Sequence, residues 1–386
     1  MKPVVVCVFG TRPEAIKMAP VVLALREDPD FDLKVCVTAQ HRQMLDQVLD
    51  LFGIVPDADL DLMRPGQTLA DITSRVLQGL GPVFEVMKPS LVLVHGDTTT
   101  TMAASLAAFY GRVPVGHVEA GLRTETLDNP FPEEMNRRVT SRLAALHFAP
   151  TPRSEANLLA EAVDPAGIYL TGNTVIDALL ATAARHAEPA SDGRRRLLVT
   201  AHRRENWGQP MEDICHAVRD LVEAYPDLEV VFPAHLNPLV QDVARRVLGD
   251  HPRVQIIAPL DYEPFVQAMQ EATLILTDSG GVQEEAPSLG KPVLVMRTTT
   301  ERPEAVVAGT VRLVGVKRED IVRHARELLD DAAAYERMAR SVNPYGDGRA
   351  AARIREAVRH FLGLRSDRPL DRFHLTETLP TPAHKG

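Results

Sequence analysis

Three acidic residues stand where ligand-binding side chains are expected in a parallel sheet. Asp97 follows an apolar, strand-like run at Leu91–His95, and Glu119 follows a second run at Val113–Val118. Glu133 opens a helical pattern. The carboxyl ends of neighbouring parallel strands meet at one edge of the sheet, and crowded carboxylates have separated pKa values that suit acid and base roles. We therefore predict proton-transfer chemistry, the alternatives being a helix cap for Asp97 and a partner of the helix dipole for Glu133.

Basic residues follow other predicted strands. Arg12 and Lys17 come after a glycine turn that ends the run Val4–Phe9, where they suit the ligand-binding edge of the sheet, or Lys17 is a solvated charge of the helix. His202 ends a strand of the second half, where it suits contact with a phosphate or a proton transfer, or is a structural histidine. Because these cations accompany the carboxylates, the sequence favours direct proton chemistry over metal binding.

The segment LILTDSGGVQEEAPSLGKPVLVM reads as strand, glycine turn, helix and strand. Glycines in such a turn let backbone N–H groups approach an anion. A carboxylate one turn into the helix suits the hydroxyls of a ribose, and an arginine beyond the second strand suits a phosphate. The pattern predicts a nucleotide-diphosphate site that uses Ser279, Gly280, Gly281, Glu285 and Arg302.

Several other chemistries lack their motifs. The chain contains no G-x-S-x-G nucleophile elbow and no G-x-x-x-x-G-K-[ST] phosphate loop, and its first glycine turn is not G-x-G-x-x-G. The cysteines Cys7, Cys36 and Cys215 are far apart, without the spacing of a zinc or redox site. We expect them to be buried thiols.

Strand-like runs alternate with helical patterns in this chain of 386 residues from Val4 to Leu362, which is typical of doubly wound parallel α/β sheets. A loose stretch, His186–Gly193, separates two such series. We expect two Rossmann-like domains that face each other across a cleft, residues 1–172 with the catalytic carboxylates and residues 173–364 with the nucleotide site. The last helical pattern, 350–362, either stays with the second domain or crosses back to the first. Residues 365–386 are expected to form a flexible tail.

Composition disfavours two classes of binding partner, nucleic acid and membranes. The net charge is −9, the pI is near 5.8 and aromatic residues make up 5% of the chain, which disfavours nucleic acid. The apolar run Pro3–Phe9 is broken at once by charged residues, so it predicts a strand rather than a signal peptide or a membrane span. We expect a cytoplasmic protein without a membrane partner.

The segments FGTRPEAIKMAP, VLVHGDTTTT, GHVEAGLRT, FPEEMNRR, TGNTVIDALL, AHRREN, LTDSGGVQEEAPSLGKPVLVMR and NPYGDG resemble the bacterial non-hydrolysing UDP-N-acetylglucosamine 2-epimerases. The resemblance runs from about Val4 to Leu362. It implies the glycosyltransferase-B architecture and the interconversion of UDP-N-acetylglucosamine and UDP-N-acetylmannosamine, a precursor of surface polysaccharides. It further implies anti elimination of UDP to a 2-acetamidoglucal and readdition, without a cofactor or a metal.

Roles follow from the same resemblance. It implies that Asp97, Glu119, Glu133 and His202 act in catalysis. Contacts with the substrate are implied for Asp97, Glu119 and His202 again, and for Arg12, Lys17, Phe265, Ser279, Gly280, Gly281, Glu285 and Arg302. It also implies a second UDP-N-acetylglucosamine site that activates the enzyme, formed by Gln40, His41, Gln43 and His235. A homodimer is the family expectation.

Three other functions are weighed against this one. A hydrolysing epimerase would release N-acetylmannosamine and UDP, and a glycosyltransferase of the same fold would need an acceptor. A non-catalytic sugar-nucleotide sensor would bind UDP without exchanging the proton at C2. Nothing in the motifs favours hydrolysis, and the carboxylate cluster and the lack of an amphipathic membrane-binding helix disfavour a transferase.

Overall fold

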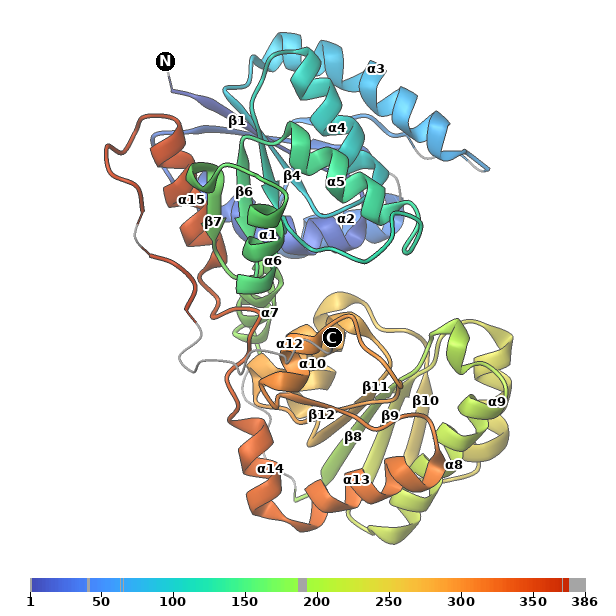
Figure 1. The fold of residues 1–386 in the computed structure, drawn as a ribbon. Helices are drawn as coiled ribbons and strands as arrows, with labels where there is room; N and C mark the ends of the chain where they lie inside the picture. Colours follow the sequence, from blue (N-terminus) through green and yellow to red (C-terminus); the bar gives the residue numbers. More distant parts are fainter. Residues whose placement is uncertain are drawn as a thin grey trace. The chain divides into compact units, whose positions relative to one another are not determined.

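The computed structural model describes residues 2–39, 42–62, 64, 66–186, 193–369 and 371–374. The chain forms two compact units, one from Met1–Ala178 with Tyr345–His374 and the other from Leu179–Pro344 (Figure 1). The chain first passes from one unit to the other inside helix α7, Thr174–Ala183, a few residues after the boundary expected at 172. This point also precedes the expected linker, of which residues 187–192 lie outside the described residues.

The first unit is built on a seven-stranded parallel sheet with the order β3-β2-β1-β4-β5-β6-β7. Its strands are β1 (Val4–Phe9), β2 (Asp32–Val37), β3 (Ala58–Asp59), β4 (Leu91–His95), β5 (Val115–Val118), β6 (Leu146–Ala149) and β7 (Ile168–Leu170). Its helices are α1 (Arg12–Arg26), α2 (Arg42–Phe52), α3 (Leu69–Met87), α4 (Thr99–Tyr110), α5 (Glu133–Leu143), α6 (Pro152–Ala160), the start of α7 and α15 (Ala350–Phe361). The short strand β3 was not predicted from the sequence.

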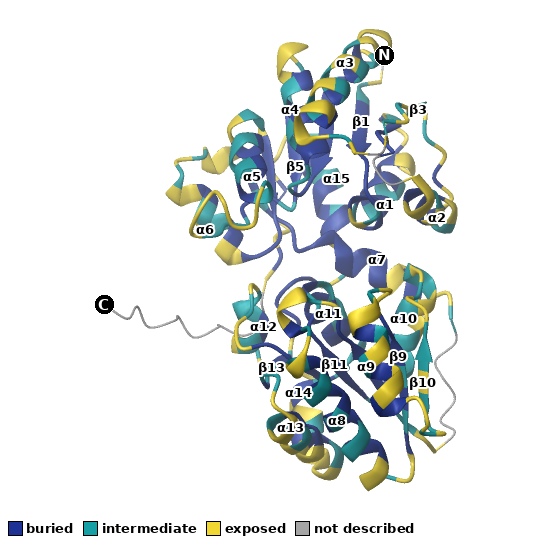
Figure 2. Cartoon of the chain, turned by 90° about the vertical axis from the view of Figure 1, so that its right-hand side faces the viewer, coloured by how far each residue is buried: buried dark blue, intermediate teal, exposed yellow. Residues whose placement is uncertain are grey.

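Helices cover both faces of this sheet. In Figure 1, α3, α4 and α5 lie on one face and α1, α2 and α15 on the other. Strands covered on both sides read as continuous apolar runs, and β4 is buried at every position. Figure 2 shows the same pattern as dark strands under helices whose outer faces are exposed.

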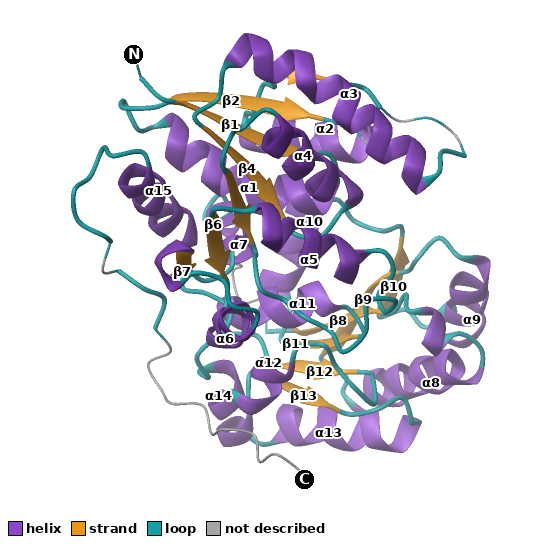
Figure 3. Cartoon of the chain, turned by 45° about the horizontal axis from the view of Figure 1, so that its top comes forward, coloured by secondary structure: helices purple, strands orange, loops and turns teal. Residues whose placement is uncertain are grey.

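The second unit contains a six-stranded parallel sheet with the order β10-β9-β8-β11-β12-β13. Its strands are β8 (Arg195–Thr200), β9 (Leu228–Pro233), β10 (Val254–Ile257), β11 (Leu274–Thr277), β12 (Val293–Val295) and β13 (Val311–Leu313). Its helices are α8 (Gln209–Ala224), α9 (Pro238–Leu248), α10 (Tyr262–Glu271), α11 (Gly280–Glu285), α12 (Pro303–Val307), α13 (Arg318–Asp330) and α14 (Ala332–Ala339). Side chains of α8, α9, α13 and α14 share one core with the sheet. Figure 3 shows the course of these helices beside the strands.

Each sheet has one point where the order of its strands reverses. In the first unit this point lies between β1 and β4, and in the second between β8 and β11. Doubly wound sheets bind ligands outside the carboxyl ends of the strands at this position. The topology confirms the predicted fold class. The segments with Arg12, Asp97, His202 and Ser279 follow these four strands, at the edges where sheets of this class bind ligands.

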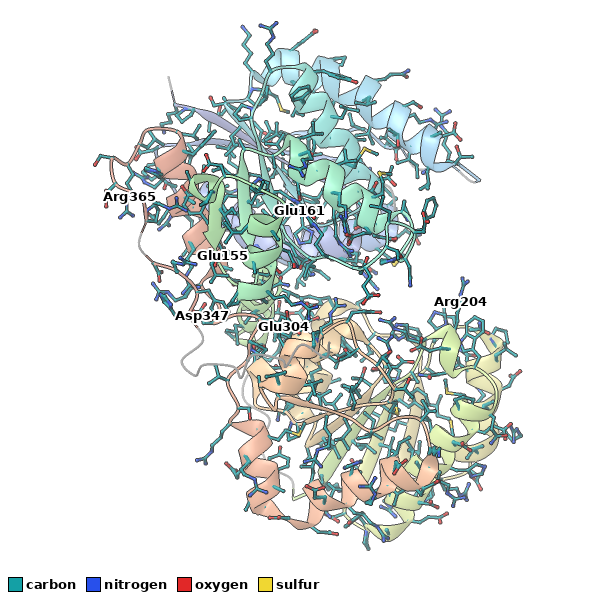
Figure 4. The ribbon with its side chains drawn as sticks, viewed as in Figure 1. Glu155, Glu161, Arg204, Glu304, Asp347 and Arg365 are labelled. Carbon is teal, nitrogen blue, oxygen red and sulfur yellow. The ribbon has the colours of Figure 1, made fainter. Side chains whose placement is uncertain are left out.

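The end of the described chain belongs to the first unit. Helix α15 packs against α1. Of the expected flexible tail 365–386, residues 375–386 lie outside the described residues, whereas the described part, 365–369 and 371–374, makes specific contacts with the first unit. Arg365 donates to Glu356 at 2.9 Å, and Arg368 donates to three backbone carbonyls beside β7. Phe373 is only 2% exposed, and its N–H donates to the edge strand at Leu170 O at 3.0 Å. These contacts extend the fold to His374 (Figure 4 labels Arg365).

The three cysteines are buried and unbridged, as expected. Among the described residues, none of the helices combines the length and the apolar character that a membrane crossing requires.

Candidate functional site

The β1–α1 turn presents the first predicted cations. Thr11 caps α1 and forms a capping box with Glu14, so the helix begins directly after the glycine turn. Arg12 lies in its first turn and is partly exposed. Lys17, one turn further on, makes an ion pair with Glu119 through Nζ. The structure therefore joins two sequence-predicted residues that are far apart in the chain.

Glu119 occupies a constrained position directly after β5. Its φ is 63°, in the left-handed region that residues other than glycine rarely adopt. Its side chain is 9% exposed. Asn173 donates from Nδ2 to Glu119 Oε2 at 2.8 Å, and His95 Nε2 lies 3.9 Å from the same oxygen. Burial alone would raise the pKa of Glu119, but Lys17 and its other partners outweigh burial and lower the pKa to about 2.

Asp97 lies in the turn after β4. Arg137 of α5 donates from Nη2 to Asp97 Oδ2 at 2.6 Å, and Asn136 donates from Nδ2 to the Asp97 carbonyl at 2.9 Å. Burial raises the pKa of Asp97, Arg137 opposes that shift, and the negative charge of Glu119 adds to it. The two carboxylates thus share one neighbourhood, yet their pKa values are shifted in opposite directions.

Glu133 lies in the first turn of α5. It precedes Arg137 by one helical turn, so both side chains lie on the same face of the helix. Its Oε2 is buried and has no hydrogen-bond partner among the described residues. The neighbouring Glu134 is instead engaged by Arg137 and Arg138. Of the two acids in the first turn of α5, Glu133 is therefore the one with a buried carboxylate oxygen that accepts no hydrogen bond from the described residues.

In the second unit, Asp278 organises the turns after β8 and β11. It is fully buried and accepts hydrogen bonds from the backbone N–H groups of His202 and Arg203 and from Asn206 Nδ2, each at 2.9 Å to Oδ2. His202 Nδ1 lies 3.0 Å from Oδ1. Burial works against its ionisation, but the His202 side chain and these donors lower the pKa of Asp278. The His202 side chain is 45% exposed, so its ring is anchored but accessible.

The glycine turn brings Arg302 to the start of α11. A Cβ on Gly280 would lie 3.1 Å from Arg302 Cζ, so the guanidinium lies directly against the bare backbone. Arg302 donates from Nε to Glu284 at 2.7 Å and from Nη1 to Glu301 at 3.1 Å. Ser279 precedes the helix, and its hydroxyl makes no capping hydrogen bond. Backbone N–H groups of a first helical turn have no partner within the helix and are suited to an anion.

Glu285 and Phe265 come from two different helices of this unit. Glu285 ends α11 beside the hydroxyl of Tyr262, whose pKa is raised by burial and by that carboxylate. Phe265, one turn after Tyr262 in α10, is partly buried. Within the described part of the chain, no contact distinguishes Phe265 as a ligand-binding residue.

The residues expected to form the second substrate site are only partly visible. Gln40 and His41 lie outside the described residues. Gln43 is exposed in the first turn of α2. His235 follows β9, is exposed, and its ring centroid lies 6.4 Å from that of His202 at an interplanar angle of 28°. The structure therefore pairs this predicted regulatory residue with a predicted substrate-binding one.

Comparison with known proteins decides the family. A family model described as UDP-N-acetylglucosamine 2-epimerase matches residues 23–359. The chain belongs to the UDP-N-acetylglucosamine 2-epimerase family. It is 57% identical over 369 residues to the UDP-N-acetylglucosamine 2-epimerase of Escherichia coli K12, a match that covers 92% of this chain and 98% of that protein.

Solved structures of the family superpose closely. The UDP-GlcNAc 2-epimerase of Neisseria meningitidis bound to UDP-GlcNAc has a TM-score of 0.82 at 51% identity, covering 92% of this chain and 99% of that one. The S. aureus MnaA–UDP structure has a TM-score of 0.84 at 48% identity, covering 97% of this chain and 100% of that one.

Four residues that contact the candidate site residues or hold their turns were not predicted from the sequence. Arg137 and Asn173 contact the carboxylates, and Glu14 and Asp278 hold the turns together. All four stand inside motifs that had been recognised, but their partners lie 40 or more residues away for Arg137, Asn173 and Asp278, so no local spacing reveals the contact. Across the described residues, no group of three or more His, Cys, Asp or Glu side chains is arranged to hold a metal ion.

Proposed function

We propose that the chain interconverts UDP-N-acetylglucosamine and UDP-N-acetylmannosamine without releasing free sugar, supplying a precursor of surface polysaccharides. The reaction proceeds by anti elimination of UDP and its readdition through 2-acetamidoglucal. Membership of the family supports the substrate class. The opposite pKa shifts of Asp97 and Glu119 at one strand-end cluster support proton transfer as the chemistry.

The two carboxylates suit different tasks. An acid–base group works best when its pKa lies near the working pH, and burial moves Asp97 in that direction. Glu119 is held as an anion by Lys17, which suits it to stabilise charge and to orient the sugar. We therefore assign the proton at C2 to Asp97 and an electrostatic role to Glu119.

In the elimination step, Asp97 takes the proton from C2. The electron pair of that C–H bond forms the C1–C2 double bond as the C1–O bond breaks, and UDP leaves with the bonding pair. In the readdition step, an acid delivers a proton to the opposite face of C2 and an oxygen of UDP attacks C1. Glu133 is our candidate for that acid, because its buried Oε2 has no hydrogen-bond partner in the described chain.

UDP must stay bound throughout, since it is both leaving group and nucleophile. The turn of Ser279, Gly280 and Gly281, with Arg302 against it, suits the diphosphate. Glu285 suits the ribose, and His202 is anchored by Asp278 beside the same turn. The Neisseria and S. aureus relatives were solved with UDP-GlcNAc and with UDP, which supports UDP as the group that is bound. Arg12 and Phe265 are proposed to contact the substrate as well.

The net reaction is an isomerisation: one proton leaves C2 to Asp97, another is delivered to C2 by Glu133, and UDP leaves and returns. Exchange of protons with water then restores Asp97 and Glu133 to their starting states, so no oxidant is consumed and no cofactor is needed. We also propose that UDP-GlcNAc activates the enzyme through a second site with Gln40, His41, Gln43 and His235. The short distance between the rings of His235 and His202 supports coupling of that site to the nucleotide site. A homodimer is proposed from the family.

The test is to incubate the full chain with UDP-GlcNAc in deuterated water and to follow C2 by proton NMR. We expect UDP-ManNAc to accumulate and deuterium to enter C2 of both UDP-sugars. Free N-acetylmannosamine as the main product would show the hydrolysing reaction instead. Binding of UDP without exchange at C2 would show a sensor and contradict the proposal.

A further inference from the structure

We propose that Asn173 is a positioning residue for Glu119. It orients the Glu119 carboxylate and holds it next to the turn that contains Asp97. The inference rests on the proposed function, because Glu119 matters here as part of the epimerase machinery. It concerns a residue outside the strand-end carboxylates and cations that carry the proposed chemistry. Asn173 stands between β7 and α7 and is 4% exposed.

The orientation of the Asn173 amide follows from the hydrogen bonds of its oxygen and its nitrogen. Its Oδ1 accepts a hydrogen bond from Val175 N at 3.0 Å, at the first turn of α7. The oxygen is thereby used by the backbone, so the nitrogen must be the atom that faces Glu119, at 2.8 Å from Oε2. The same side chain caps a helix and presents a donor to a buried carboxylate.

The backbone of Asn173 is equally confined. Its N–H donates to Tyr345 O at 2.6 Å, which ties it to the returning C-terminal segment. Gly172, immediately before it, has a φ of 84°, and a Cβ there would lie 3.4 Å from Gly346 Cα. A side chain at Gly346 would in turn lie 3.0 Å from Ile176 Cγ1. The Asn173 side-chain amide therefore extends from a tightly packed segment of backbone.

Asn173 and Lys17 both reach Oε2 of Glu119. Holding this oxygen from two elements determines the rotation of the carboxylate. Its other oxygen, Oε1, lies 3.9 Å from the position of a Cβ on Gly96, the residue before Asp97. Lys17 of α1 holds Glu119 through its positive charge, whereas Asn173 orients the carboxylate by an uncharged hydrogen-bond donor. Mutation can separate these two contributions.

The charged and titratable groups around Glu119 are Lys17 from α1, His95 from β4 and Asp97 from the turn after β4. Burial lowers the pKa of His95 to about 4, so His95 is neutral at neutral pH and cannot replace a lost donor by charge. Asn173→Asp would keep an oxygen for Val175 N and place a second carboxylate against Glu119. Asp and Asn are equally good helix caps, so this variant changes the contact with Glu119 and leaves the cap intact.

The experiment measures kcat and KM for epimerisation against pH, UDP affinity by calorimetry, and the melting temperature of full-length Asn173→Asp and Asn173→Ser. For Asn173→Asp we expect kcat at neutral pH to fall about tenfold or more and a new acidic limb to appear, because two facing carboxylates hold one proton between them. For Asn173→Ser, which retains a capping oxygen without the amide donor, we expect a smaller fall in kcat and no new limb. UDP affinity is expected to stay within about twofold in both.

Asp331→Ser is the matched control, since Asp331 caps α14 through the same contact with the residue two positions on, Ala333 N at 2.9 Å. It should leave the pH profile unchanged. The inference is overturned if Asn173→Asp and Asn173→Ser both keep the wild-type kcat and pH profile, or if they lose activity only in proportion to folded protein. If the wild-type chain itself shows no exchange at C2, it is the proposed function that fails.

Discussion

Arg137 donates from Nη2 to Asp97 Oδ2 at 2.6 Å, across 40 residues of sequence. The same guanidinium donates from Nη1 to Glu134 at 3.0 Å, so its plane is held by its own helix, α5. Asn136 of α5 also donates to the carbonyl of Asp97. The carboxylate that we assign to the C2 proton is thus aimed by a helix that begins at Glu133, a second acid of the proposed site.

Replacing Asp97 by Asn tests its assignment directly. The amide cannot accept the C2 proton, so we expect kcat to fall by about 10²- to 10⁴-fold. UDP affinity, measured by calorimetry, should stay within about twofold, because the proposed diphosphate contacts lie around Gly280. An equal loss of turnover and of UDP affinity would make Asp97 a binding or structural residue.

Arg137→Gln should move the pH dependence of turnover. Arg137 lowers the pKa of Asp97 against the effect of burial, so its removal raises that pKa. Asp97 must be unprotonated to take the C2 proton, and the acidic limb of kcat should therefore move to higher pH by about one pH unit. Arg138→Gln is the control, because Arg138 pairs with the same Glu134 but not with Asp97. Equal profiles for the two variants would contradict this assignment.

Glu14→Gln should destabilise the first unit selectively. The buried Glu14 carboxylate accepts from Gly10 N and Thr11 N and also from the hydroxyls of Thr98 and Thr101 at the start of α4. The NH₂ group of a glutamine would face N–H and O–H groups that also donate, so some of these groups would lose their hydrogen bond. Each buried polar group left unpaired costs about 1–3 kcal/mol.

By circular dichroism, the first unit of Glu14→Gln should unfold at a lower urea concentration. The unfolding transition reported by fluorescence of the single tryptophan, Trp207 in the second unit, should stay at the same urea concentration. Asp71→Asn removes the equivalent group from the exposed capping box of α3, where the hydrogen bonds of the Asp71 carboxylate to described residues stay with Thr68, and it should have a smaller effect. A larger shift for Asp71→Asn than for Glu14→Gln would contradict the bridging role.

Gly280→Ala should weaken UDP binding without unfolding the protein. The new Cβ would lie 3.1 Å from Arg302 Cζ, and Arg302 is tethered by Glu284 and Glu301, so its guanidinium must shift from the turn. We expect about a tenfold loss of UDP affinity by calorimetry, equivalent to about one charge-assisted hydrogen bond. Gly81→Ala, where a Cβ meets nothing within 4 Å, should leave affinity unchanged. Unchanged affinity in Gly280→Ala would remove this turn from the proposed UDP site.

The strand ends were predictable from sequence because a parallel strand covered on both faces is a continuous apolar run, and the residues directly after such a run lie at the ligand-binding edge of the sheet. That reasoning located Asp97, Glu119, His202 and Ser279. It missed Asn173 and Asp278, because their contacts cross 54 and 76 residues and depend on the order of the strands, which periodicity does not encode.

The boundary between the units was predicted too early for a related reason. Helix α7 has one continuous helical pattern, although its two halves belong to different units. The side chain that anchors its first half, Asp177, accepts from Ala350 N and Ala351 N of α15 at 3.2 and 2.8 Å. Only a contact across more than 170 residues reveals the division, so no local signal could have placed it.

Phe373→Ala should show that the segment after α15 is part of the first unit. The ring is buried against Gly172, with Phe373 Cγ 3.5 Å from the position of a Cβ there, and Arg353 lies over it at 5.9 Å. Removing a buried phenylalanine ring costs about 3–5 kcal/mol, so the unfolding of the first unit should move to clearly lower urea by circular dichroism. Phe109→Ala, at a ring that is 57% exposed, is the matched control and should have little effect. Because Gly172 adjoins Asn173, Phe373→Ala should also lower kcat more than Phe109→Ala does, and equal effects of the two variants would show that the segment is dispensable.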